Sequence, residues 1–135
     1  LDDLILKAEY AEFLERTRLG ESWPQADLGV TVPGQYIKLE EQIQLYLSLL
    51  SLRSRREIPF KEAVTRWYQA VYLPVVNIIR ERGILRDLPG RTETDLYLWV
   101  LEHRDALEEE WGWPIQPEKA AVHLVERFGP KSRRG

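Results

Sequence analysis

The chain has 135 residues, of which 44% are hydrophobic and 30% are charged, a balance typical of a globular protein and not of a disordered one. Nineteen Lys and Arg against 22 Asp and Glu give a formal net charge of -3, which excludes a general attraction to nucleic acid or anionic lipid. The absence of cysteine removes disulfides, thiolate nucleophiles and thiolate metal ligands. It also fits a reducing compartment, so we expect a cytoplasmic protein.

The length suits one compact domain, which would bury roughly two-thirds of the surface of its unfolded chain. We expect this domain to cover residues 1–129, with a flexible basic tail at 130–135. The longest apolar-rich run, residues 45–52, is interrupted by Ser48 and Ser51 and is far shorter than the about 20 residues that cross a bilayer. No membrane partner is therefore expected. Since the chain contains no methionine, we expect it to be a piece of a longer protein.

Two helices are predicted in the first part of the chain. The first starts at Asp2 or Asp3, which can cap it, and runs to about residue 18 before Gly20 ends it. Residues 21–34 carry the Pro, Gly and Asp punctuation of an ordered loop, with room for a short extended piece. A second helix follows over about 35–56, where segment length decides between a helical and an alternating leucine pattern.

A third helix is predicted from Pro59 to Gly83, since proline is favoured in the first turn of a helix and glycine just after its end. Its apolar residues keep helical spacing on both sides of Pro74. Proline lacks a backbone donor and crowds the carbonyl four residues earlier. We therefore expect this helix to be kinked or broken near Pro74.

A fourth and a fifth helix complete the predicted fold. The fourth starts at Thr92, whose spacing to Asp95 is that of a capping box, and it ends at Gly112. The fifth starts at Pro117 and ends at Gly129. With no internal repeat and no secure strand, the sequence predicts an all-α fold: a compact bundle of five to six helices.

Neither histidine lies in a pattern that predicts a metal site. A helical carboxylate metal site uses Glu-x-x-His pairs, but Val100 stands three residues before His103 and Ala120 three before His123. His103 lies inside an apolar arc, which is typical of a core histidine bonded to a neighbour. No Gly-x-Ser-x-Gly elbow and no phosphate-binding glycine motif is present. We therefore predict no enzyme activity, no metal and no cofactor.

Excess apolar surface is the main functional signal of this sequence. Apolar residues at 43–52 surround most of the axis of the second helix, and one leucine of the fourth helix lies on its otherwise polar side. Large exposed apolar patches are rare in monomers, so these leucines are either interior or contact a protein partner or a second copy. The candidate partner-binding residues are Leu45, Leu47, Leu49, Leu52 and Leu98.

A nucleic-acid interface is the first alternative. It would use the basic cluster Arg53, Arg55 and Arg56, because phosphate contacts come mainly from arginine and lysine. Glu57 follows this cluster directly, and the acidic run at 108–110 is equally prominent. The charge balance therefore disfavours extended binding to nucleic acid by this domain alone.

A small-ligand site lined by Arg91, Trp99 and His103 is the second alternative. Arg91 lies beside the start of the fourth helix, where backbone donors and a guanidinium both favour an anion. Folding alone also explains this turn, because Pro89 and Gly90 are ordinary turn residues before a helix cap. Convergence of the three candidate side chains would favour the ligand site.

Five segments resemble a group of uncharacterised bacterial helical domains that lie C-terminal to ParB-like N-terminal domains: residues 62–64, 67–68, 71–76, 83–92 and 95–99. The most specific part is the Pro-Gly-Arg-Thr turn with the aromatic helix after it, and residues 1–19 also resemble that group. The resemblance implies a helical region of a bacterial protein linked to DNA, with no catalytic residue to assign here. Gln42 and Tyr46 stand where we expect histidines in that group, which argues against a metal role.

Together these observations predict a non-enzymatic helical accessory domain in a larger bacterial, DNA-linked protein. Its expected role is self-association or docking of a protein, and a homo-oligomer fits the apolar surplus. The nucleic-acid interface and the small-ligand site stay open as alternatives.

Overall fold

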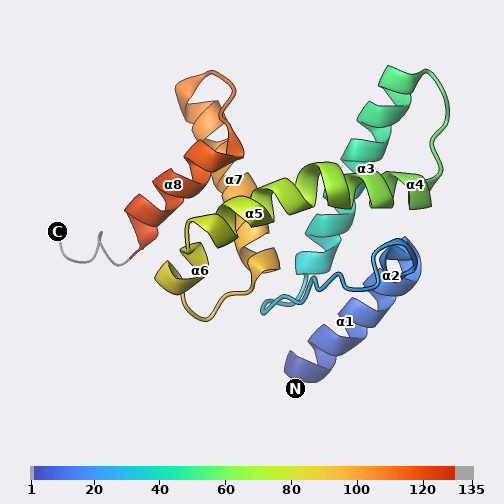
Figure 1. Ribbon diagram of the computed structural model, residues 1–135, viewed down its shortest axis with the longest axis horizontal. Coiled ribbons are helices and arrows are strands. Elements are labelled where there is room, and N and C mark those ends of the chain that lie inside the picture. Colours follow the sequence, from blue (N-terminus) through green and yellow to red (C-terminus); the bar gives the residue numbers. More distant parts are fainter. Residues whose placement is uncertain (1, 130–135) are drawn as a thin grey trace. The chain divides into compact units, whose positions relative to one another are not determined.

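The computed structural model describes residues 2–129, and they form an all-α fold without a strand (Figure 1). Counting the helical segments at 60–81 as one, the described residues contain five long helices, which confirms the predicted bundle class. Residues 21–34 contain no strand. No helix in the described range is long and apolar enough to cross a membrane.

The chain divides into two compact units, Leu1–Leu73 and Pro74–Gly135. Whether residues 1–129 behave as the single expected domain stays a prediction, since two compact units can unfold together or separately. The flexible tail expected at 130–135 lies outside the described residues.

The first unit begins with α1 (Asp2–Thr17) and the short α2 (Leu19–Ser22). The expected end of the first helix at Gly20 is wrong, because the chain turns two residues earlier, at Arg18, which has a left-handed φ of 58°. The buried Thr17 hydroxyl holds this turn: it donates to the Phe13 carbonyl at 2.8 Å and accepts the Leu19 N–H at 3.3 Å. A threonine side chain thus makes the turn that we had assigned to glycine.

Two tyrosines fix the loop between α2 and α3 (Gln35–Ser54). The rings of Tyr10 and Tyr36 stack with centroids 5.3 Å apart. The Leu28 N–H donates to the Tyr10 hydroxyl, and the Tyr36 hydroxyl donates to the Leu28 carbonyl, both at 3.0 Å. Burial raises the pKa of Tyr10, and the bond from the Leu28 N–H offsets part of this rise. Side chains therefore satisfy a loop backbone that has no strand partner.

The core of the first unit lies against the N-terminal half of α3. α3 packs on α1 and on α4 (Phe60–Trp67). Its buried residues, Tyr36, Leu39 and Ile43, all precede residue 44. Trp67 is 1% exposed, and its ring lies 5.5 Å from that of Tyr72. This packing leaves the C-terminal half of α3 without a buried residue.

A π-helix stands at the place where a kink or a break was expected, and the helix is not broken there. η1 (Tyr68–Tyr72) joins α4 to α5 (Leu73–Glu81). The Leu73 N–H bonds to the Tyr68 carbonyl, five residues back. Since Pro74 cannot donate to the carbonyl four residues earlier, a locally widened turn lets the chain stay helical through the proline.

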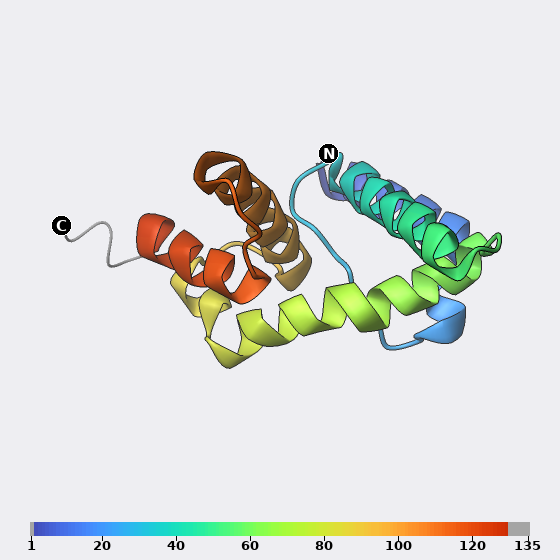
Figure 2. The ribbon, with the colours of Figure 1, turned by 90° about the horizontal axis from the view of Figure 1, so that it is seen from above.

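The second unit contains α5, α6 (Ile84–Asp87), α7 (Glu93–Trp111) and α8 (Pro117–Phe128). α7 and α8 form a hairpin, seen in brown and red in Figure 2. The short α6, which was not predicted, precedes the turn before α7. Most of the buried apolar residues of these two helices are aliphatic, and Tyr97 is the one buried aromatic side chain among them. The aliphatic ones are Leu96, Leu98, Val100, Leu101, Leu107, Ala120, Ala121 and Leu124.

The predicted capping box of α7 is confirmed. The Thr92 hydroxyl accepts the Asp95 N–H at 3.1 Å, and the Asp95 carboxylate accepts the Thr92 N–H at 3.0 Å. Gly112 ends the helix with a φ of 82°, as predicted. Both helix ends follow from local chemistry that the sequence displays directly.

Removing the cap should measurably destabilise the second unit. We expect Thr92→Ala to lower the free energy of unfolding by about 1 kcal/mol, because the Asp95 N–H loses its acceptor at the start of α7. Urea unfolding followed by circular dichroism measures the change. Thr92→Ser retains the hydroxyl and should lose much less, and equal losses in both variants would contradict a role for the hydroxyl bond.

Candidate functional site

Three leucines form an exposed apolar surface on α3. Leu45, Leu49 and Leu52 are 62%, 50% and 74% exposed. Their spacing of four and then three residues places them along one side of the helix, as in the seam of a coiled coil. We call these three residues the α3 leucine surface.

The α3 leucine surface belongs to a longer stretch in which nothing is buried. Every residue from 44 to 57 is half-buried or exposed, although six of the first nine are Leu or Tyr. Figure 1 shows the C-terminal turns of α3 continuing beyond the crossing with α4. Residues far apart in the sequence therefore cover the first half of α3 and leave the second half open to solvent.

Two leucines of the predicted partner site do not belong to the exposed surface. Leu98 is 1% exposed, so its assignment to a partner-binding surface is corrected: this leucine is part of the interior. Leu47 is half-buried and projects to another side of α3 than the leucine surface. The predicted set is thus reduced to Leu45, Leu49 and Leu52.

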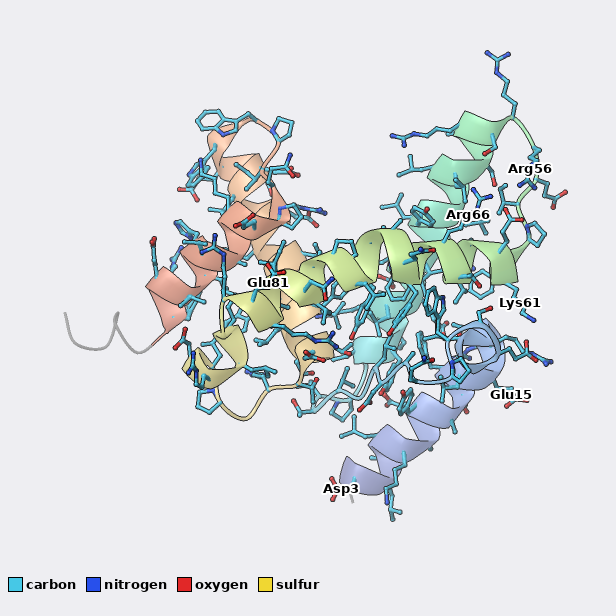
Figure 3. All side chains as sticks on the ribbon, in the orientation of Figure 1. Asp3, Glu15, Arg56, Lys61, Arg66 and Glu81 are labelled. Carbon is cyan, nitrogen blue, oxygen red and sulfur yellow. The ribbon has the colours of Figure 1, made fainter. Side chains whose placement is uncertain are left out.

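The basic cluster at the end of α3 is exposed but partly neutralised. Arg56 pairs with Glu62 at 3.0 Å, and Arg66 pairs with the same carboxylate at 3.5 Å. Both arginines are labelled in Figure 3. Arg53 and Arg55 form no ion pair within residues 2–129. Arg55 also ends α3 in a left-handed conformation with φ 53°. Within the described residues, two guanidinium groups of the cluster are therefore unpaired and the third is neutralised.

A row of ring contacts joins α7 to α8 in the second unit. The centroids of successive rings in this row are 5.0–6.4 Å apart. None of these rings is buried. The row runs through Trp99, Phe128, His103, His123, Trp111 and Trp113.

The two histidines at the centre of this row bond to each other. His103 Nε2 lies 2.8 Å from His123 Nδ1, so one ring donates and the other accepts when the pair carries at most one net charge. The predicted bond of His103 to a neighbour is confirmed, but His103 is half-buried and not a core residue. Burial lowers the pKa of His103, and the positive charges of His123 and Arg127 lower it further. His103 therefore favours the neutral imidazole.

The three candidate ligand residues come together in the same row. The Arg91 guanidinium lies 5.5 Å from the centre of the Trp99 ring, and Phe128 contacts both Trp99 and His103. Cation–π and ring contacts of this kind hold the hairpin together without a ligand. Within residues 2–129, no group of three or more potential ligands is arranged for a metal ion.

The sequence did not indicate which side chains contact His103. The i, i+4 spacing of Trp99 and His103 shows that they share a face of α7, but nothing local indicates which residues of α8 face them. His123 and Phe128 come from the other arm of the hairpin. Their pairing depends on the rotation of α8 about its own axis, which tertiary packing determines.

No protein-family model, curated protein or solved structure matches this chain.

Acid should destabilise the α7–α8 hairpin through the histidine pair. Because the folded state lowers the pKa of His103, the unfolded chain binds more protons as pH falls below the ordinary histidine pKa of about 6.5. The contribution is constant above that pH and is lost as pH falls through the folded pKa. Because His103 is partly solvated, we expect only a small loss between pH 7.5 and pH 5.

Urea unfolding of wild type and His103→Gln at several pH values measures this effect. Glutamine can still donate to His123 but cannot ionise. The variant should therefore lose part of the pH dependence between pH 7.5 and pH 5. Identical pH profiles for both chains would contradict the role of the pair.

Proposed function

We propose that this chain is a non-enzymatic helical accessory domain that binds protein, a partner or a second copy, through the α3 leucine surface. The observation that carries the proposal is the absence of any buried residue between 44 and 57 in a segment rich in leucine. Burial of apolar area contributes about 25 cal/mol per Å², so covering these leucines favours association. In keeping with the resemblance, we place this domain in a larger bacterial, DNA-linked protein.

The arrangement of the exposed leucines fits a specific docking surface better than a surface that merely lowers solubility. The leucines occupy one side of a regular helix, and Glu41 and Arg53 lie at either end of them, both exposed. A hydrophobic centre with a charged rim is the usual anatomy of a protein interface. The N-terminal half of α3 is held in the core by its buried residues. The exposed leucines therefore lie on a helix whose position is fixed by packing.

Polar replacement on α3 tests the proposal. We expect the triple variant Leu45→Gln/Leu49→Gln/Leu52→Gln to abolish self-association in sedimentation velocity and to reduce binding of a hydrophobic dye. The free energy of unfolding should change by less than about 0.5 kcal/mol per site, because the leucines are exposed and glutamine is a good helix former. Self-association by wild type, or dye binding that depends on these leucines, supports docking.

A single substitution at Ile37 provides the matched control. Ile37 is on the same helix and is 61% exposed, as Leu45 is 62% exposed, but it lies about 80° away around the axis. Ile37→Gln should leave association and dye binding near wild type, whereas Leu45→Gln should lower them. A wild-type chain that neither self-associates nor binds dye through these leucines would contradict the proposal.

A further inference from the structure

We propose that the occupant of the α3 leucine surface is the same surface of a second copy, with the two α3 helices antiparallel. This inference rests on the proposed function and specifies its partner. The spacing of the three leucines carries the first step. Leu45 and Leu52 lie at nearly equal distances from Leu49. A two-fold axis near Leu49 therefore places Leu45 of each copy opposite Leu52 of the other.

The charges of α3 fit this antiparallel arrangement and oppose a parallel one. Glu41 lies one helical turn before Leu45, and Arg53 follows Leu52. Both side chains are exposed, and neither has an ion pair within residues 2–129. In an antiparallel pair, each acidic end meets a basic end, whereas a parallel pair places like charges side by side.

The register brings the charged groups within reach. When Leu45 faces Leu52 of the other copy, Glu41 lies just beyond the end of that copy's α3 at Ser54, about 4.5 Å along the axis past Arg53 at 1.5 Å per residue. Arg55, the C-cap of α3, lies at the same end of the helix. A two-fold interface forms each contact twice. Arg56 already pairs with Glu62, so Arg53 and Arg55 are the groups left to bind Glu41.

Charge reversal tests the pairing. We expect Glu41→Arg to weaken dimerisation about tenfold, since two attractions become two repulsions at a solvated rim. Arg53→Glu/Arg55→Glu should weaken it similarly. An equimolar mixture of these two variants should recover dimers, because both rim contacts become attractive between unlike chains. Glu109→Arg changes the net charge equally at an exposed site on α7 and should leave dimerisation unchanged.

Cysteine pairing tests the direction, and the natural chain has no cysteine to interfere. Leu45→Cys and Leu52→Cys chains should form a disulfide when they are mixed. Leu52→Cys alone should not, because its two copies lie about 10 Å apart along the axis, beyond the reach of a disulfide. Disulfides in each single variant, with none between the two, would overturn the antiparallel pair in favour of a parallel one.

Failure of this inference and failure of the proposed function give different results. If the triple glutamine variant loses association but charge reversal has no effect, the antiparallel pair is wrong and docking by the leucines stands. A monomeric wild type that binds dye through these leucines also overturns the second copy as occupant, and it leaves docking of another protein. A wild-type chain that neither self-associates nor binds dye through these leucines overturns both this inference and the proposed function.

Discussion

Trp67→Ala should be among the most damaging substitutions in the first unit, lowering the free energy of unfolding by about 3–5 kcal/mol. Trp67 is 1% exposed and packs against Tyr72. Its removal leaves a cavity beside the π-helix η1, whose widened turn can close around it only in part. Urea unfolding followed by circular dichroism measures the loss.

Trp113→Ala is the matched control for that experiment, because the same side chain is deleted at a site that is 57% exposed. Its ring contact with Trp111 is a surface contact, so we expect a loss below about 1 kcal/mol. Similar losses at Trp67 and Trp113 would contradict the assignment of Trp67 to the core.

Leu124→Ala should lower the free energy of unfolding of the second unit by about 2–5 kcal/mol, since Leu124 is fully buried in α8. Loosening α8 should also raise the pKa of His103 toward its ordinary value, because burial and His123 both hold it low. Urea unfolding and NMR titration of the histidine measure the two effects. Glu126→Ala, at an exposed site of the same helix, should change neither. An unchanged unfolding midpoint in Leu124→Ala would contradict the hairpin core.

The two core variants together test whether residues 1–129 are one domain. In one cooperative domain, Trp67→Ala and Leu124→Ala lower the same single transition. If the units Leu1–Leu73 and Pro74–Gly135 unfold separately, each variant shifts only its own transition. Calorimetry of the two variants distinguishes these outcomes.

Much of the secondary structure follows from short-range chemistry. The capping box at Thr92 and the left-handed Gly112 were predicted correctly, because each depends on residues within one helical turn. A kink or break near Pro74 was predicted, since the missing donor is a property of proline itself. The chain instead stays helical through a π-helix, because it can accommodate a lost bond in several ways. Arg18 shows the converse error: a threonine bond, not Gly20, ends α1.

Sequence by itself determined the all-α class and most helix ends. It also determined that α3 carries more apolar residues than one core-facing side of a helix can hold. Only the tertiary structure decided where that surplus lies: Leu98 is buried, Leu45 and Leu52 are exposed, and His103 meets His123. The physical reason is the distance along the sequence over which the deciding interactions act. A cap or a helical period is set by neighbours a few residues away, whereas burial and pairing depend on which distant segment packs against a given side of the helix.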